Sequence, residues 1–232
     1  MSSCLADLAI KPVALGASDL VMMDAVALSR AIQSRQVSCV EVMAAYLDHI
    51  ERVNPLVNAI VSLQDRSDLV QQAQERDSQL ARGECLGWMH GFPQAVKDLS
   101  PTKGIHTTQG SLMFKDHVPR SDAIFVERIK RAGGIVIGKT NTAEFGLGSQ
   151  TYNAVFGTTL NAYDQAKTAG GSSGGAAVAV ALRMLPVADG GDSAGSLRNP
   201  AAFNNILGFR SSPGCVPSEG REVCLPPLAL QL

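Results

Sequence analysis

Glycine is concentrated in one part of this chain, and that part carries little charge. Fifteen of the 22 glycines lie between Gly133 and Gly214, and only five of the fifty residues from Asn141 to Gly190 are charged. Dense glycine lets backbone approach backbone or ligand closely, and low charge is typical of buried segments. The pattern therefore predicts a buried, tightly turned region in the second half of the chain.

Short apolar runs alternate with helical patterns around this region. Residues 92–96 and 135–137 are predicted as strands, and 185–188 is a further strand candidate. Residues 121–131 are predicted as a capped helix and residues 174–183 as a buried helix rich in Ala and Val. Because strands and helices alternate, the sequence favours an α/β fold.

The first ninety or so residues are predicted to be mainly helical. Ser38 and Glu41 fit a capping box, in which the serine oxygen accepts from the backbone of the glutamate and the glutamate reaches back. Apolar residues at helical spacing follow as far as Ile50, and Pro55 is expected to prevent continuation of this helix. A second, polar helix is predicted from about Gln64 to Arg82.

Composition narrows the classes of protein. With 20 Lys+Arg against 21 Asp+Glu, the net charge of −1 argues against a dedicated nucleic-acid binder, and 45% apolar residues can form a core. Scattered cysteines without a Cys-x-x-Cys pair suggest reduced thiols in a cytoplasmic protein. We expect no secretory signal over Met1 to Ala14. We also expect no membrane span, because the most apolar stretch, Ala176 to Leu182, is too short to cross a bilayer.

Two segments contain the residues of known motifs but lack the surrounding sequence that those motifs require. Residues 133–140 fit the P-loop pattern, yet their middle is Ile135-Val136-Ile137, so we interpret them as a buried strand ending in a turn. Residues 171–175 contain G-x-S-x-G, but all four histidines precede them, which argues against the Ser…Asp…His order of that motif. The chain also has no clustered His, Cys and carboxylate set, so we predict no metal site.

Three segments together can carry chemistry. Lys97 ends an apolar strand, residues 170–175 form a Gly/Ser turn before the Ala-rich helix, and residues 189–200 hold a second glycine-rich stretch. A serine nucleophile needs a base within hydrogen-bond reach, and with histidine excluded the available base is a lysine whose pKa burial has lowered. Glycine-rich turns can present backbone N–H groups to an oxyanion.

The combination resembles the amidase signature family. Gly-Gly-Ser-Ser-Gly-Gly at 170–175 is followed by Asp-x-x-Gly-Ser-x-Arg-x-Pro at 192–200, and the His-Gly-x-Pro-x-x-Val-Lys-Asp flank ends at Asp98. The resemblance covers roughly His90 to Glu222 and, more loosely, the helical N-terminus. It implies a mixed α/β sheet flanked by helices. Because family members are longer, the resemblance also implies a fold that is incomplete at the C-terminus.

The resemblance further implies a Ser–cis-Ser–Lys triad. Ser196 would attack the amide carbonyl and form an acyl-enzyme. Ser172 would bridge to Lys97, with a cis non-proline peptide next to the Ser172–Ser173 bond. Lys97, neutral at rest, would take the proton of Ser196 through Ser172. No cofactor or metal is needed for this chemistry.

Other residues receive supporting roles by the same resemblance. The oxyanion hole would consist of the backbone amides of four consecutive residues: Ser193, Ala194, Gly195 and Ser196. Ser173 would support the Gly/Ser turn, and Asp192 and Arg198 would orient the nucleophile loop by ion pairing.

We expect a single partial amidase domain over residues 1–232. Its parts would be a mainly helical region at 1–89, a catalytic core at 90–222 and a divergent tail at 223–232. The expected partner is a small-molecule amide, with no direct contact to nucleic acid or membrane. A homo-oligomer is also open, because an unpaired sheet edge and exposed apolar surface favour association.

Three functional hypotheses follow. The first is an amide hydrolase that uses Lys97, Ser172 and Ser196. The second is a catalytically inactive, truncated amidase-like protein or interaction partner. The third, an amidotransferase subunit for misacylated tRNA, ranks lower because Leu197-Arg198-Asn199-Pro200 is more similar to stand-alone amidases.

Overall fold

The computed structural model of the chain describes residues 17–217, so the predictions for Met1 to Ala14 and for the tail at 223–232 concern positions outside the described residues. The helices, with the two short 3-10 turns η1 and η2, are α1 (Ala17–Met22), α2 (Ala25–Gln33), α3 (Cys39–Val57), α4 (Arg66–Ala81), η1 (Leu112–Phe114), α5 (Ile124–Arg131), η2 (Glu144–Gly146), α6 (Gly174–Ala181) and α7 (Arg198–Phe203). The strands are β1 (Ile60–Val61), β2 (Pro93–Lys97), β3 (Ile135–Thr140), β4 (Tyr152–Asn153) and β5 (Gly157–Thr158).

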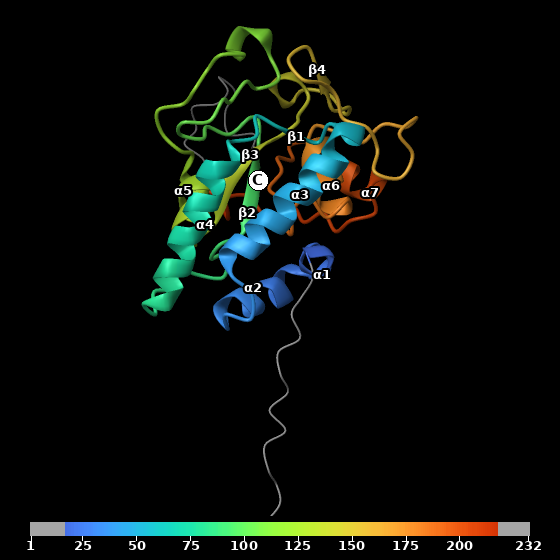
Figure 1. Ribbon diagram of the computed structural model, residues 1–232. Coiled ribbons are helices and arrows are strands. Elements are labelled where there is room, and N and C mark those ends of the chain that lie inside the picture. The colour runs from blue at the N-terminus through green and yellow to red at the C-terminus, as the bar shows by residue number, and fades with distance from the viewer. Residues whose placement is uncertain (1–16, 218–232) are drawn as a thin grey trace, which may run out of the picture.

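A mixed sheet stands at the centre of the molecule, with helices around it (Figure 1). Its order is β1-β3-β2, in which β2 runs parallel to β3 and β1 runs antiparallel to it. β4 and β5 form a separate two-stranded hairpin. The prediction of an α/β fold with a mixed sheet flanked by helices is confirmed.

The two faces of the sheet pack against different helices. Ala95 and Ile135 join a large apolar cluster with residues of α2, α3, α4 and α6. Val96 and Val136 join a smaller cluster with Val126 of α5. Because successive side chains of a strand point to opposite faces, Lys97 shares the face of Ala95 and is directed toward the N-terminal end of α6.

α3 begins at the predicted capping box and ends later than predicted. Ser38 Oγ accepts from the Glu41 N–H at 3.1 Å, and the Glu41 carboxylate accepts from the Ser38 N–H at 2.8 Å. Pro55 does not prevent continuation, since it lies in the last turn, where its missing N–H removes only one intrahelical bond. The helix ends at Val57, and Asn58 follows in the left-handed conformation with φ 54°.

Two other predicted elements differ in the structure. α5 begins three residues after Ser121 and has no side-chain cap, because its N-cap residue is Ala123, which carries no side-chain acceptor. Asp122, just before it, binds the Lys103 N–H at 2.8 Å and the Lys130 amine at 2.7 Å. Residues 185–188 form no strand: Leu185 is buried in the large cluster, and Pro186 has no N–H to donate to a sheet. The polar helix predicted at 64–82 is confirmed as α4.

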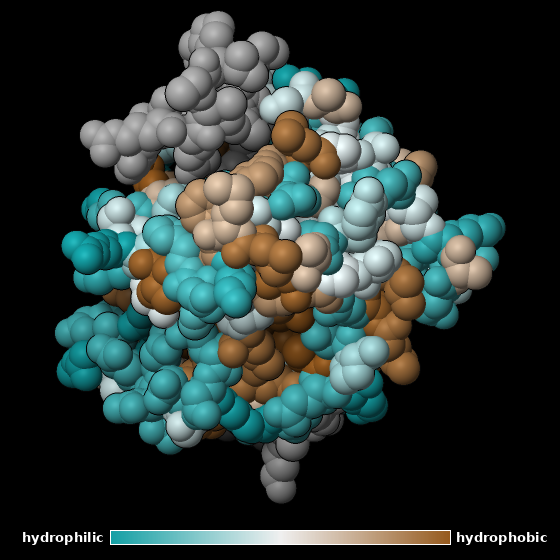
Figure 2. Space-filling model, turned by 90° about the horizontal axis from the view of Figure 1, so that it is seen from above, coloured by the Kyte–Doolittle hydropathy of each residue, from teal (hydrophilic) through white to brown (hydrophobic). Residues whose placement is uncertain are grey.

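The face seen from above gathers apolar side chains around a hollow near its centre (Figure 2). Within residues 17–217, no helix has both the length and the apolar character needed to cross a bilayer.

Candidate active site

Lys97 is the last residue of β2, and its amine lies inside the protein. The side chain is 1% exposed, and Nζ lies 2.8 Å from Ser172 Oγ and 2.7 Å from Ser173 Oγ. Burial lowers the pKa of Lys97 from 10.5 to about 7, against the opposing charges of Asp189 and Asp192. A lysine with this pKa is substantially neutral near neutral pH, as a proton acceptor must be.

Ser172 and Ser173 lie in the turn that leads into α6, where the Gly171–Ser172 peptide is cis. The Ser173 hydroxyl donates to the carbonyl oxygen of Gly191 at 3.2 Å and accepts from the Gly191 N–H at the same distance. Since its only hydrogen is engaged there, Ser173 accepts from the Lys97 amine. The lone pair of a neutral Lys97 is then available to the Ser172 hydroxyl.

Asp192 orders the loop that carries Ser196. Its fully buried carboxylate accepts from the Gly195 N–H at 2.7 Å, from the Arg198 N–H at 3.2 Å and from Arg198 Nε at 2.8 Å. Burial alone would raise the pKa of Asp192, but the Arg198 guanidinium and these N–H groups outweigh it and hold the pKa well below its usual value. The loop is therefore folded around an ionised carboxylate.

Ser196 is half-buried and adjoins the serine turn through its backbone. Its carbonyl oxygen accepts from the Ser173 N–H at 2.9 Å. Between residues 17 and 217, the Ser196 hydroxyl forms no hydrogen bond with Ser172 or Lys97. The structure thus brings the side chains of Lys97, Ser172 and Ser173 into direct contact and places Ser196 beside them.

The backbone amides predicted to bind an oxyanion are not equivalent. The Gly195 N–H is engaged by Asp192, which makes it unavailable to a ligand. In the described part of the chain, the N–H groups of Ser193, Ala194 and Ser196 donate to no protein acceptor. Within residues 17–217, three of the four predicted amides therefore have no protein acceptor.

Asp189 contacts Lys97 and is a site residue that the sequence motifs did not predict. It accepts the Lys97 backbone N–H at 3.1 Å and lies 3.4 Å from Gln94 Nε2, and burial raises its pKa. An aspartate directly before Gly190-Gly191, at the edge of a charge-poor segment, was the signal that could have found it.

A second buried lysine, Lys139, makes contacts that stabilise the fold and lie away from the serine turn. It pairs across the sheet with Val96, on the face opposite Lys97, and its amine donates to the Ser100 carbonyl oxygen at 2.6 Å and to Thr102 Oγ1 at 2.8 Å. Burial lowers its pKa to about 8. The amine thus holds the turn that follows Lys97, and the interpretation of residues 133–140 as a buried strand is confirmed.

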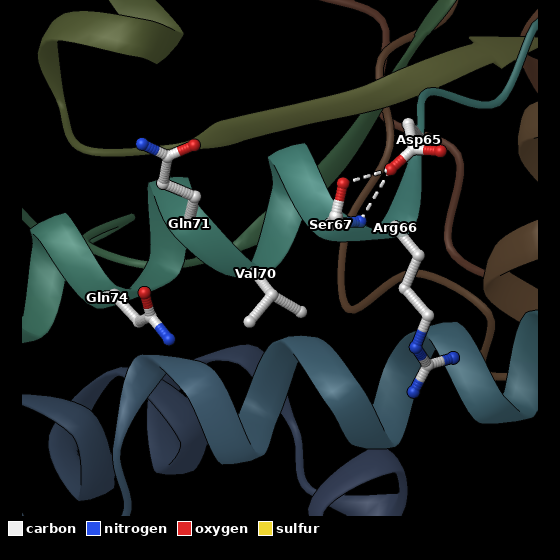
Figure 3. A pocket seen from close by; sticks show the side chains of 6 residues that line it. All are labelled: Asp65, Arg66, Ser67, Val70, Gln71 and Gln74. Atoms are coloured by element: carbon white, nitrogen blue, oxygen red, sulfur yellow. Dashed lines mark hydrogen bonds between the residues drawn. The ribbon is translucent and has the colours of Figure 1, made fainter.

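Other parts of the described chain contain fewer groups that could react or bind a ligand. Residues 17–217 contain no group of three His, Cys, Asp or Glu side chains placed to bind a metal. A shallow hollow over the start of α4 (Figure 3) is lined by Asp65, Arg66, Ser67, Val70, Gln71 and Gln74. Its charged groups already have partners, since Asp65 caps α4 and Arg66 binds Asp48 and Glu51 of α3.

Comparison with known proteins gives a family match over most of the chain. The family model described as Amidase matches residues 41–229. A glutamyl-tRNA(Gln) amidotransferase subunit from Acidothermus cellulolyticus is 43% identical over 203 residues, and its counterpart from Azoarcus sp. is 42% identical over 193 residues. These matches cover 88% and 83% of this chain but only 40% and 39% of the relatives. The chain thus spans about two fifths of the length of these curated relatives.

Solved structures likewise match most of this chain and less than half of their own length. A crystal structure of an amidase superposes with a TM-score of 0.78 at 36% identity, covering 85% of this chain and 45% of the other. The peptide amidase of Stenotrophomonas maltophilia superposes with a TM-score of 0.73 at 32% identity, covering 79% and 39%. A 6-aminohexanoate cyclic dimer hydrolase gives 0.69 at 34% identity, covering 79% and 36%.

Proposed function

The chain belongs to the amidase family, and we propose that it carries the reacting residues for hydrolysis of a carboxamide to a carboxylate and ammonia or an amine. The observation that carries this proposal is the contact between the Lys97 amine and the Ser172 hydroxyl, 2.8 Å apart in a fully buried site. A neutral amine against a serine hydroxyl is a base that needs no histidine.

In the proposed acylation, the Ser196 hydroxyl oxygen attacks the carbonyl carbon of the amide. As this bond forms, the Ser196 proton passes to Ser172 Oγ while the Ser172 proton passes to Lys97 Nζ, which becomes an ammonium. The tetrahedral intermediate then collapses. Lys97 returns its proton through Ser172 to the departing nitrogen, and an ester remains on Ser196.

The negative oxygen of the intermediate requires hydrogen-bond donors. We assign this role to the backbone N–H groups of Ser193, Ala194 and Ser196, because the Gly195 N–H is occupied by Asp192. Asp192 and Arg198 would act by holding the loop in which these amides lie.

Deacylation would use the same relay with water as the nucleophile. Lys97, through Ser172, would accept a proton from water as the water attacks the Ser196 ester. The proton then returns to Ser196 Oγ as the product leaves as a carboxylic acid, which loses its remaining proton to solvent and becomes the carboxylate. One water is consumed for each amide, and the enzyme is regenerated.

A second candidate is favoured by the names of the curated relatives, which are glutamyl-tRNA(Gln) amidotransferase subunits. In that function the chain would release ammonia from an amide for transfer to misacylated tRNA, with the same triad. The stretch Leu197-Arg198-Asn199-Pro200, more similar to stand-alone amidases, keeps this candidate second.

Ammonia release tests the proposal. The purified chain would be incubated with benzamide, a series of short-chain amides, and glutamine, beside the variant Ser196→Ala. We expect hydrolysis by the wild type and none by Ser196→Ala, with expression unchanged. Preference for glutamine over every simple amide would favour the amidotransferase candidate. No release from any amide would support the inactive alternative.

A further inference from the structure

We propose that Thr151 is a positioning residue of this site: its hydroxyl joins the two ends of the turn at residues 170–174 and so holds Ser172 against Lys97. This inference rests on the proposed function of Ser172. Thr151 immediately precedes β4, is 2% exposed, and belongs to none of the segments that the amidase resemblance drew upon.

The hydroxyl of Thr151 bonds to both sides of the turn. Its oxygen accepts from the Gly174 N–H at 2.9 Å, and its hydrogen donates to the carbonyl oxygen of Gly170 at 2.8 Å. The carbonyl oxygen of Ser172 lies 3.3 Å away and competes for the same hydrogen. One side-chain oxygen thus replaces the backbone partners that a turn of this size lacks.

At two positions the turn lies so close to Gln150 and Thr151 that only glycine fits. A Cβ atom added to Gly174 would lie 2.4 Å from Thr151 Oγ1, and one added to Gly171 would lie 2.7 Å from the backbone of Gln150. Such distances are below van der Waals contact, so glycines are required here.

The position of Thr151 is itself fixed by hydrogen bonds of the β4–β5 hairpin. Its carbonyl oxygen accepts from the Thr159 N–H at 2.9 Å, which extends the β4–β5 hairpin. Asn153 on β4 donates to Asn141 at the end of β3 at 2.7 Å. The hydroxyl therefore transmits the position of the central sheet to the serine turn, while Lys97 reaches the same turn from β2.

Thr151→Val tests the inference, because valine keeps the shape and removes only the hydroxyl. Thr151→Ser keeps the hydroxyl. Thr107→Val is the control: Thr107 is equally buried, and its hydroxyl donates to the Ile105 carbonyl oxygen at 3.2 Å but makes no bond to the turn or to the residues that support Thr151. The first readout is the rate of Ser196 labelling by a fluorophosphonate probe.

We expect Thr151→Val to slow labelling about 100-fold, as misplacement of a reacting group does, and Thr151→Ser to restore most of the rate. Thr107→Val should label at the wild-type rate. Equal rates for the wild type and Thr151→Val would overturn the inference. So would a loss in Thr151→Val that Thr151→Ser fails to restore.

A second readout does not depend on activity. In protein labelled with ¹³C at lysine Cε, the Lys97 resonance, assigned by its absence in Lys97→Met, is titrated by NMR. An opened turn admits water to the amine, so Thr151→Val should raise the midpoint from the wild-type value near 7 toward 10.5, with Asp189 and Asp192 unchanged in every variant. If the wild type does not label, the proposed function fails, and this titration still decides the role of Thr151. An unchanged midpoint would contradict it.

Discussion

The Asp189 carboxylate contacts Lys97 through the backbone and not through the side chain. It accepts the Lys97 N–H at 3.1 Å, while the amine of Lys97 points to Ser172 and Ser173. A carboxylate paired with the amine would stabilise the ammonium form and raise its pKa. With the carboxylate engaged by the backbone, burial dominates and the pKa of Lys97 falls to about 7. The arrangement leaves a neutral amine facing two hydroxyl groups.

The buried amine should cost stability, and the cost should depend on pH. Since the pKa of Lys97 is about 7 in the folded protein and 10.5 when unperturbed, the unfolded state binds more protons between these values. The stability of the wild type should therefore rise with pH, relative to Lys97→Met, by roughly 3–5 kcal/mol between pH 7 and pH 10.5. Chemical denaturation of both proteins across this range measures the difference. A difference that is constant with pH would show that Lys97 is not buried in its neutral form.

The rate of Ser196 acylation should follow the same titration. Below pH 7 the protonated amine cannot accept a proton, so the second-order rate constant should fall about tenfold for each pH unit and level off above the pKa. Labelling rates between pH 5.5 and 9 test this directly. A profile without a slope in this interval would exclude Lys97 as the base.

Removing the charge of Asp192 should loosen the nucleophile loop. In Asp192→Asn one carboxylate oxygen becomes an NH2 group that cannot accept a hydrogen bond, so the Gly195 N–H or the half-exposed Arg198 side chain loses its partner. An unpaired buried Gly195 N–H costs about 1–3 kcal/mol. We expect a lower free energy of unfolding together with slower labelling. Asp164→Asn, which alters an exposed aspartate that also accepts a backbone N–H, is the control. If both variants behave as the wild type, the loop does not depend on Asp192.

Much of the fold could be predicted because its signals are local. The capping box at Ser38 and the β-branched run of β3 each specify an element within a few residues, and both are confirmed. The predictions based on Pro55 and Ser121 were wrong, because residue type alone does not determine where a helix begins or ends. A proline in the last helical turn removes only one backbone hydrogen bond, and the residue at the N-cap of α5 is Ala123, which has no side-chain acceptor.

The site was predictable only in part, because some of its contacts join distant segments. The Gly/Ser turn and Lys97 stand out as motifs, and the structure places them in contact. Thr151 carries no motif; its importance arises from lying against Gly170 and Gly174, contacts that no local pattern encodes. The engagement of the Gly195 amide by Asp192 likewise depends on how the loop folds back on itself.

Exposed apolar side chains after α7 should promote self-association. Leu207 is 93% exposed and Phe209 is 77% exposed, and surfaces of this kind mark interaction sites. We expect the double variant Leu207→Ser/Phe209→Ser to shift the concentration-dependent mass, measured by light scattering after size exclusion, toward the monomer. Val26→Ser, which alters an exposed apolar residue of α2, should leave it unchanged. A monomeric wild type at all concentrations would contradict the prediction.

The most direct measurement of the proposed chemistry is the site of covalent labelling by a fluorophosphonate, read by intact mass and peptide mapping. Labelling requires a serine activated by its neighbours, so it reports the assembled triad independently of the identity of the amide. We predict one adduct, on Ser196, in the wild type, and none in Ser196→Ala or Lys97→Met. A wild-type chain that takes up no label, or that is labelled elsewhere, would contradict the assignment of Lys97, Ser172 and Ser196 as a working triad.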